Sequence, residues 1–215
     1  MRDQSAWDVW LAGEPLEYSR HVCGFFRTPE AAYDMLLPFM KEGIDRGERG
    51  FYLVDSDRRE EHIRRLEQIG IDAANAERSG QLEVRGWDTA QFRTGYFDQY
   101  AMLALLEGAL VDGRDRGFKQ TRLVGHMEWA NKDVPGVENL LEFETRVNYM
   151  SARNDDPLIC TYDLASFGAG LIVDILRTHP YVIIGGILQQ NPFFVPPDEM
   201  LRELRDRAPK VPSPA

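Results

Sequence analysis

Two polar side chains, His126 and Glu128, end an aliphatic run in the segment RLVGHMEWA. Because side chains alternate between the two faces of a strand, both are expected on the same face. A histidine beside a carboxylate can act as an acid–base pair or bind a ligand. Alternatively, Glu128 accepts a hydrogen bond from a helix N-terminus or pairs with Arg27, Arg58 or Arg146. A carboxylate at the end of a buried strand needs a partner. For Glu128 the sequence allows either a ligand or a protein group as that partner.

Aromatic and charged side chains also end two other apolar runs, HVCGFFR and LICTYD. The aromatic members would line an apolar pocket with a few polar groups, as small-molecule sites require. The alternative is that each aromatic side chain is an ordinary core residue. The candidate ligand-binding residues are therefore Phe25, Phe26, Arg27, His126, Glu128, Trp129, Tyr162 and Asp163.

The histidines and cysteines do not form a known metal-binding motif. No two of the four histidines are four residues apart, and neither Cys-x-x-Cys nor HExxH occurs. We therefore expect no metal ion. A composite site of His126, Glu128 and Asp163 is the one geometric possibility that the sequence leaves.

The remaining histidines and the two cysteines receive structural interpretations. His21 begins an apolar run and is expected to be hydrogen-bonded, and His179 before a proline is expected to fix a turn. His62 lies in a segment rich in Arg and Glu and is expected to be solvated. Cys23 and Cys160 lie inside apolar runs, as buried free cysteines do, which fits a reducing cytoplasm. Because no GxSxG motif occurs, nucleophilic catalysis is not expected.

Composition narrows the class of protein. The chain has 215 residues, of which 43% are hydrophobic, which suits one large α/β domain. With 25 basic and 35 acidic residues the formal net charge is −10, so direct binding to nucleic acid or to an anionic membrane is not expected. No apolar run approaches the ~18 residues of a membrane span. The sequence favours a cytoplasmic location.

Apolar runs alternate with helical patterns along the chain. The runs that predict strands are 21–26, 50–55, 81–84, 122–127, 158–162 and 181–188. Helical periodicity occurs at 29–46, 57–69, 97–116, 136–153, 167–177 and 198–207. Continuous apolar strands that alternate with helices predict a three-layer α/β/α domain with a mostly parallel central sheet. In such sheets ligands bind at the carboxyl ends of the strands, which is where the candidate residues stand.

Motifs along nearly the whole chain resemble one known family. The ordered set HVCGFFRTPEAAY, LLPFMKEGIDRGERGFYLVD, GHMEWA, PGVENLLEFETRVN, CTYDL and ILRTHPYVIIGG is similar to the MEDS domain, a sensory domain of methanogens and methylotrophs. The resemblance covers residues 18–204, and predicts an N-terminal extension at 1–17 and a flexible tail at 205–215. It implies a RecA/KaiC-like fold without a functional phosphate loop, used to sense small molecules.

The segment after the first predicted strand lacks the parts of a phosphate loop. A Walker loop needs GxxxxGK[ST], because backbone amides cradle the phosphates and the lysine neutralises them. Between Gly24 and Tyr33 there is no second glycine and no lysine. By the resemblance, Glu128 stands near the second acidic motif of a RecA-like ATPase. We expect no ATP or GTP hydrolysis and do not expect an enzyme.

Three functions are consistent with these observations. The first is a sensory domain that binds a small molecule, including an apolar or hydrocarbon-derived one, and signals to a regulatory protein or an output domain. The second is a partner-switch module without a ligand, and the third is a nucleotide-binding or hydrolytic enzyme using Glu128 and Asp163. No output domain is expected after the last strand, a homo-oligomer is compatible with the sequence, and no cofactor is assigned. We also expect Arg27 or Arg146 to reach the cleft and pair with one of these two carboxylates.

Overall fold

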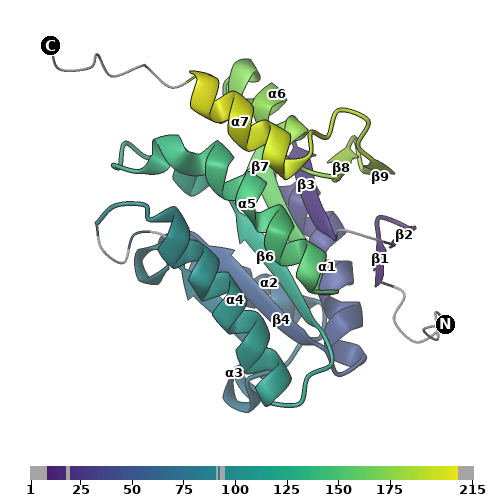
Figure 1. Ribbon diagram of the computed structural model, residues 1–215. Coiled ribbons are helices and arrows are strands. Elements are labelled where there is room, and N and C mark those ends of the chain that lie inside the picture. The colour runs from purple at the N-terminus through teal and green to yellow at the C-terminus, as the bar shows by residue number, and fades with distance from the viewer. Residues whose placement is uncertain (1–8, 18–19, 91, 93–94, 208–215) are drawn as a thin grey trace, which may run out of the picture.

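The computed structural model describes residues 9–17, 20–90, 92 and 95–207. Within these residues, seven strands form one sheet in the order β5-β4-β6-β7-β3-β8-β9, and β1 and β2 form a separate antiparallel hairpin (Figure 1). Every neighbouring pair in the large sheet is parallel except β8 and β9. The strands are β1 (Val9–Leu11), β2 (Glu14–Leu16), β3 (His21–Phe26), β4 (Arg49–Val54), β5 (Leu82–Gly86), β6 (Thr121–His126), β7 (Leu158–Asp163), β8 (Tyr181–Ile184) and β9 (Ile187–Gln190).

Helices cover both faces of the sheet. The α-helices are α1 (Pro29–Asp45), α2 (Arg59–Gln68), α3 (Ala73–Ser79), α4 (Gln99–Asp115), α5 (Leu140–Arg153), α6 (Ala169–Arg177) and α7 (Pro197–Arg207). Short 3-10 helices lie at η1 (Ser56–Arg58), η2 (Trp87–Thr89), η3 (Glu128–Asn131) and η4 (Val137–Asn139). In Figure 1, α4 and α5 lie in front of the sheet, and α1 and α2 lie behind it. The three-layer arrangement predicted from the sequence is confirmed.

Two apolar clusters form the core, one on each face of the sheet. Successive residues of one strand go to opposite clusters: Val22 packs with α1, whereas Cys23 packs with α4 and α5. On β4, Tyr52 likewise packs in the cluster on the α1 face, and Phe51 packs in the cluster on the α4–α5 face. This alternation explains why the strands are continuous apolar runs and not alternating ones, since both faces are buried.

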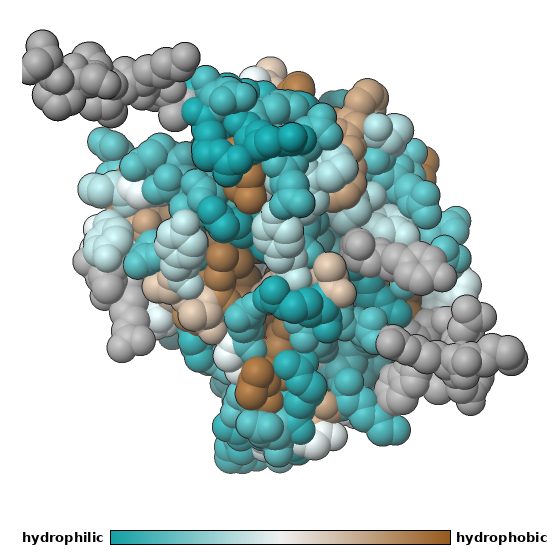
Figure 2. Space-filling view, in the orientation of Figure 1, coloured by the Kyte–Doolittle hydropathy of each residue, from teal (hydrophilic) through white to brown (hydrophobic). Residues whose placement is uncertain are grey.

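The outer surface contrasts with this interior. Figure 2 shows that the viewed face is mainly hydrophilic, with small apolar areas. The surface therefore accommodates the 28% of charged residues that the sequence contains. None of the described helices is both long and apolar enough to cross a membrane.

Three elements differ from the sequence-based expectation. The run 181–188 is not one strand but the antiparallel pair β8–β9, because Gly185 and Gly186 take positive φ angles of 59° and 82° and turn the chain. The seven-residue helix α3 was not predicted, although Asp72 caps it and Gly80 ends it at φ 76°. Within the expected extension, residues 9–16 form the hairpin β1–β2, which adds apolar side chains to the core.

The expected tail overlaps the end of α7. Residues 205–207 form the last turn of that helix, and residues 208–215 lie outside the described residues. Residues 1–8 of the expected extension also lie outside them.

A buried ion pair joins the amino-terminal part of β6 to the region between α1 and β4. Arg122 is fully buried, and its Nε lies 2.6 Å from Glu48 Oε2. Its Nη1 donates to the carbonyl oxygen of Phe39 and lies 3.1 Å from Glu42. Gly43 leaves room for this side chain, since a Cβ there would meet Arg122 Nε at 2.5 Å. The guanidinium therefore ties three segments at the edge of the sheet opposite the carboxyl ends.

We predict that Arg122→Met lowers the free energy of unfolding by roughly 3 to 5 kcal/mol, because Glu48 is left buried with only the partly exposed Arg46 as a cation. Arg116→Met removes an exposed i,i+4 pair with Asp112 and is expected to cost under about 1 kcal/mol. Urea unfolding followed by circular dichroism measures both. A double variant, Arg122→Met with Glu48→Gln, is expected to recover part of the loss. Equal, small effects for Arg122 and Arg116 would contradict a structural role for the buried pair.

Candidate functional site

A small pocket opens at the carboxyl ends of β3, β4, β6 and β7, and is called the edge pocket here. Its volume is about 80 Å³. Since one water occupies about 10 to 15 Å³ on the same measure, the pocket holds a molecule of only a few heavy atoms. It is lined by Phe26, Thr28, Pro29, Ala32, Tyr33, Val54, Asp55, Arg58, Trp87, His126, Glu128, Thr161, Tyr162 and Asp163.

The amino-terminal end of α1 forms one side of the edge pocket, where a RecA-like fold would hold phosphate. Few backbone N–H groups at this helix end are free to bind a ligand. Pro29 has no N–H, Thr28 Oγ1 accepts from Ala31 N at 3.2 Å, and the Thr28 carbonyl accepts from Ala32 N at 3.4 Å. A phosphate group would therefore find few free backbone donors here.

Glu128 begins η3 directly after β6 and lies in the pocket wall. Burial raises the pKa of its carboxyl to about 7, the negative charges of Asp163 and Asp55 add to this effect, and its own backbone N–H and Arg58 oppose it. Glu128 therefore exchanges a proton near neutral pH. In its neutral form it can donate a hydrogen bond, and in its charged form it can only accept one.

His126 ends β6 and also faces the edge pocket. Its Nδ1 lies 3.2 Å from Thr161 Oγ1. Its Nε2 is buried and has no hydrogen-bond partner among the described residues. Burial, with help from the charge of Arg58, lowers the pKa of His126 to about 4, so the ring is neutral at pH 7. A buried polar atom without a partner needs an explanation, and a bound ligand supplies one.

Three further aromatic rings pack beside His126. The ring centroids of Tyr33 and His62 lie 5.9 and 5.8 Å from that of His126, and Tyr52 stacks on it at 6.4 Å. The expectation that His62 is solvated is wrong, because it is fully buried and its Nδ1 lies 3.2 Å from Tyr33 Oη. His62 and Leu66 are one turn apart and form the buried side of α2. The sequence predicted a helix at 29–46 but did not assign Tyr33 to the site.

The cation in the pocket wall is Arg58, carried there by η1 after β4. The expectation that Arg146 reaches the cleft is wrong, because its Nη2 lies 2.6 Å from Glu142 Oε1 on the same helix. The i,i+4 spacing of that pair on α5 provides a local partner. Arg27 is exposed and is not part of the pocket lining.

Five of the eight residues proposed from the sequence are brought together in the edge pocket, namely Phe26, His126, Glu128, Tyr162 and Asp163. Phe25 and Trp129 are buried instead in the core on the α4–α5 face. Phe25 points away because it alternates with Phe26 along β3, and Trp129 packs on Phe97 at a centroid distance of 4.5 Å. Asp163 accepts from Ala165 N at 2.9 Å and from Ser166 Oγ at 2.8 Å, so it also fixes the turn after β7.

We predict that Glu128→Gln flattens the dependence of stability on pH. The wild-type carboxyl keeps its proton up to about pH 7 when folded but loses it near pH 4.5 when unfolded. The folded state therefore binds more protons between these values, and the stability from this group falls as pH rises from about 4.5 to about 7. The glutamine variant lacks this loss, so its free energy of unfolding relative to wild type rises by roughly 2 to 3 kcal/mol between pH 5 and pH 8.

Urea unfolding at a series of pH values measures this difference. Glu60→Gln, at an exposed position of α2, is the matched control and is expected to keep the wild-type slope. Parallel curves for wild type and Glu128→Gln would show that Glu128 is ionised throughout and not buried as described.

Comparisons with known proteins agree with this fold. The family model of MEDS, the MEthanogen/methylotroph, DcmR Sensory domain, matches residues 20–180. The transcriptional repressor DcmR of Methylorubrum extorquens (strain DSM 6343 / CIP 106787 / DM4) is 25% identical over 170 residues, which are 79% of this chain and 61% of the repressor. The chain thus spans about three fifths of the length of that relative.

A solved structure supports the fold alone. The KaiC-like protein of the hyperthermophilic archaeon Pyrococcus horikoshii OT3 matches with a TM-score of 0.58 and 15% identity, over 82% of this chain and 76% of the other. The predicted resemblance to a RecA/KaiC-like fold is confirmed. Because the family model covers most of the chain, this protein belongs to the MEDS family of sensory domains.

Proposed function

We propose that this chain is a sensory domain that binds one small organic molecule in the edge pocket and signals its presence to a regulatory protein or an output domain. The observation that carries the proposal is the buried Nε2 of His126, which lacks a partner in the wall of a pocket of ligand size. A ligand with one polar group would satisfy this nitrogen and would also meet Glu128.

The walls of the edge pocket favour a small hydrocarbon derivative. Phe26, Tyr33, Val54 and Trp87 provide apolar surface, and the volume of about 80 Å³ limits the ligand to a few heavy atoms. A neutral His126 Nε2 accepts a hydrogen bond, and a protonated Glu128 donates one. A hydroxyl or carbonyl group on a short carbon chain matches this pair of groups.

A ligand in this place would contact segments from four parts of the chain. The lining comes from the start of α1, from η1, from η3 and from the carboxyl end of β7. Binding would therefore fix η1 and η3 relative to α1, and we infer that a partner senses this difference. The transcriptional repressor among the relatives supports a regulatory output. The net charge of −10 favours a protein partner over direct contact with DNA.

The competing functions are less well supported. An ATPase needs a lysine and free amides at the start of α1, and the sequence FRTPE provides neither. A partner switch without a ligand would leave His126 Nε2 buried without a partner at a cost of about 1 to 3 kcal/mol. We therefore propose a non-enzymatic role for the domain, with a homo-oligomer as a compatible state.

We predict that a small hydrocarbon derivative raises the melting temperature of the full chain. A ligand at a hundredfold excess over Kd adds about 2.7 kcal/mol to the free energy of unfolding, because it binds only the folded state. A thermal-shift screen with one- to three-carbon alcohols, aldehydes, ketones and halogenated hydrocarbons measures this effect. His126→Leu, which keeps the bulk of the side chain without the nitrogen, is expected to abolish the shift.

Tyr100→Ala is the matched control, because Tyr100 is 59% exposed on α4 and is not part of the pocket lining. It is expected to respond to the ligand like the wild type. A shift that survives in both Glu128→Gln and His126→Leu would place the ligand elsewhere. A screen in which no compound of these classes has an effect would favour the partner switch.

Nucleotides provide a second test of the same proposal. We predict that isothermal titration with magnesium-ATP shows no binding near the micromolar scale of about −8 kcal/mol, because the start of α1 has no lysine or glycine loop to hold the triphosphate. Magnesium-GTP is expected to behave alike. Saturable tight binding that disappears in Glu128→Gln would instead favour a nucleotide-binding enzyme.

A further inference from the structure

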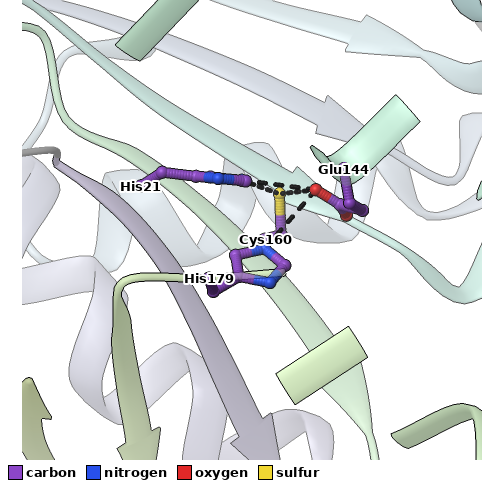
Figure 3. A group of neighbouring side chains, drawn as sticks. All are labelled: His21, Glu144, Cys160 and His179. Carbon is purple, nitrogen blue, oxygen red and sulfur yellow. Dashed lines mark hydrogen bonds and ion pairs between the residues drawn. The ribbon is translucent and has the colours of Figure 1, made fainter. Parts of the chain in front are cut away.

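Four side chains that can bind a metal meet inside the protein, away from the solvent-exposed lining of the edge pocket. Figure 3 shows His21, Glu144, Cys160 and His179 pointing toward one another from separate elements. One ligand atom from each lies within 4.8 Å of all the others. His21 begins β3, Glu144 lies on α5, Cys160 lies on β7, and His179 precedes β8. Together they are called the His–Cys–Glu cluster below.

Four of the six distances between the ligand atoms match the edges of a tetrahedron around one metal ion, and the other two are within 4.8 Å. Glu144 Oε2 lies 3.3 Å from His21 Nε2, 3.4 Å from His179 Nε2 and 3.5 Å from Cys160 Sγ. Cys160 Sγ lies 3.7 Å from His21 Nε2. Zinc bonds of about 2.0 to 2.1 Å to nitrogen or oxygen and 2.3 Å to sulfur, in tetrahedral geometry, place the ligand atoms about 3.3 to 3.6 Å apart.

Hydrogen bonds outside the cluster determine which nitrogen of His179 faces inward. His179 Nδ1 lies 3.0 Å from the carbonyl oxygen of Ile175, which can only accept, so Nδ1 carries the hydrogen. In the neutral ring, Nε2 therefore bears a lone pair. This Nε2 is buried and has no hydrogen-bond partner among the described residues, although Glu144 is close.

His21 is held in the same way. Its Nδ1 lies 3.2 Å from Asn148 Oδ1. The Nδ2 of Asn148 lies within hydrogen-bond distance of three carbonyl oxygens, including that of Thr178 at 2.8 Å, so the amide oxygen faces His21. His21 Nδ1 therefore donates, and its Nε2 lone pair points at the cluster. Histidines that bind a metal through Nε2 commonly have such a partner at Nδ1.

The remaining oxygen of the carboxylate is also occupied. Tyr162 Oη donates to Glu144 Oε1, so that Oε2 is the oxygen that faces the two histidines and the cysteine. Tyr162 lines the edge pocket as well, and thus connects the two sites. The lone pairs of His21 Nε2, His179 Nε2 and Glu144 Oε2 converge on one point in a fully buried region. This arrangement is unfavourable unless a cation lies between them.

Charge balance supports a bound cation. A divalent ion with one thiolate, one carboxylate and two neutral imidazoles gives a net charge of zero in the buried region.

We propose that His21, Glu144, Cys160 and His179 bind one zinc ion in a closed tetrahedral site. The mixed thiolate and imidazole ligands suit zinc, and the oxygen ligand is common for it. Four protein ligands leave no open position, so the ion has a structural role that joins β3, β7, α5 and the start of β8. Motif spacing did not indicate this site, and the inference does not rest on the proposed function of the edge pocket.

The metal content of the purified full-length chain tests the proposal. Element analysis after exhaustive dialysis is expected to find one zinc per chain in the wild type, and zinc is expected to be lost in Cys160→Ala and His179→Ala. Cys23→Ala is the matched control, since Cys23 is equally buried on the neighbouring strand but outside the cluster, and it is expected to keep the metal.

A second measurement keeps the test decisive where a variant fails to fold. Wild-type chain unfolded with chelator and refolded with Co²⁺ is expected to show the ultraviolet charge-transfer band of a cobalt–thiolate bond. The band is expected in Cys23→Ala, which identifies Cys160 as the ligand. Wild-type protein that refolds in the presence of chelator with an unchanged melting temperature, and that shows neither zinc nor the cobalt band, would overturn the proposal and leave a protein-only hydrogen-bond network.

Discussion

The central sheet is covered by helices on both faces, and this constrains each charged side chain that is buried between the layers. A charge in such a layer needs a partner from the protein or a ligand, because water does not reach it. At the edge opposite the pocket, Arg122 has two carboxylates and a carbonyl oxygen as partners. Near the middle, Glu144 is surrounded by two histidines, a cysteine and a tyrosine. At the carboxyl edge, Glu128 has no comparable set, and burial raises its pKa to about 7.

Arg122 and Glu144 thus have more protein partners than Glu128. This difference separates the groups that stabilise the fold from those that line the edge pocket. Arg122 and Glu144 are held by several protein groups, and removing them is expected to act on stability. The edge pocket instead combines an unpartnered nitrogen of His126, a carboxyl poised near neutral pH and aromatic walls. The start of a helix after a parallel strand is a common phosphate site, but here Thr28 and Pro29 occupy that helix start. The same architecture thus offers a small, partly apolar site.

Tyr162 lies between the two unusual parts of the molecule. This residue borders the edge pocket, while its ring packs near Phe25 on the α4–α5 face and its hydroxyl donates to Glu144 in the His–Cys–Glu cluster. A ligand in the pocket would therefore lie beside a residue whose side chain is held by the buried cluster. This arrangement gives the pocket a fixed wall on the β7 side, in contrast to the exposed Arg58 on the η1 side.

The sequence by itself determined the layers, most strands of the large sheet and five of the residues that line the pocket. Apolar runs and helical periods are local, and strand ends in a parallel sheet meet at one edge whatever the detailed packing. Only the tertiary structure decided which side of a strand or helix each aromatic faces, so that Trp129 lies in the core and Tyr33 and Arg58 join the pocket. The His–Cys–Glu cluster depends on residues 21, 144, 160 and 179, which come together through strand order and helix rotation. Spacing along the chain does not carry that information, because contacts between distant elements are set by packing in three dimensions.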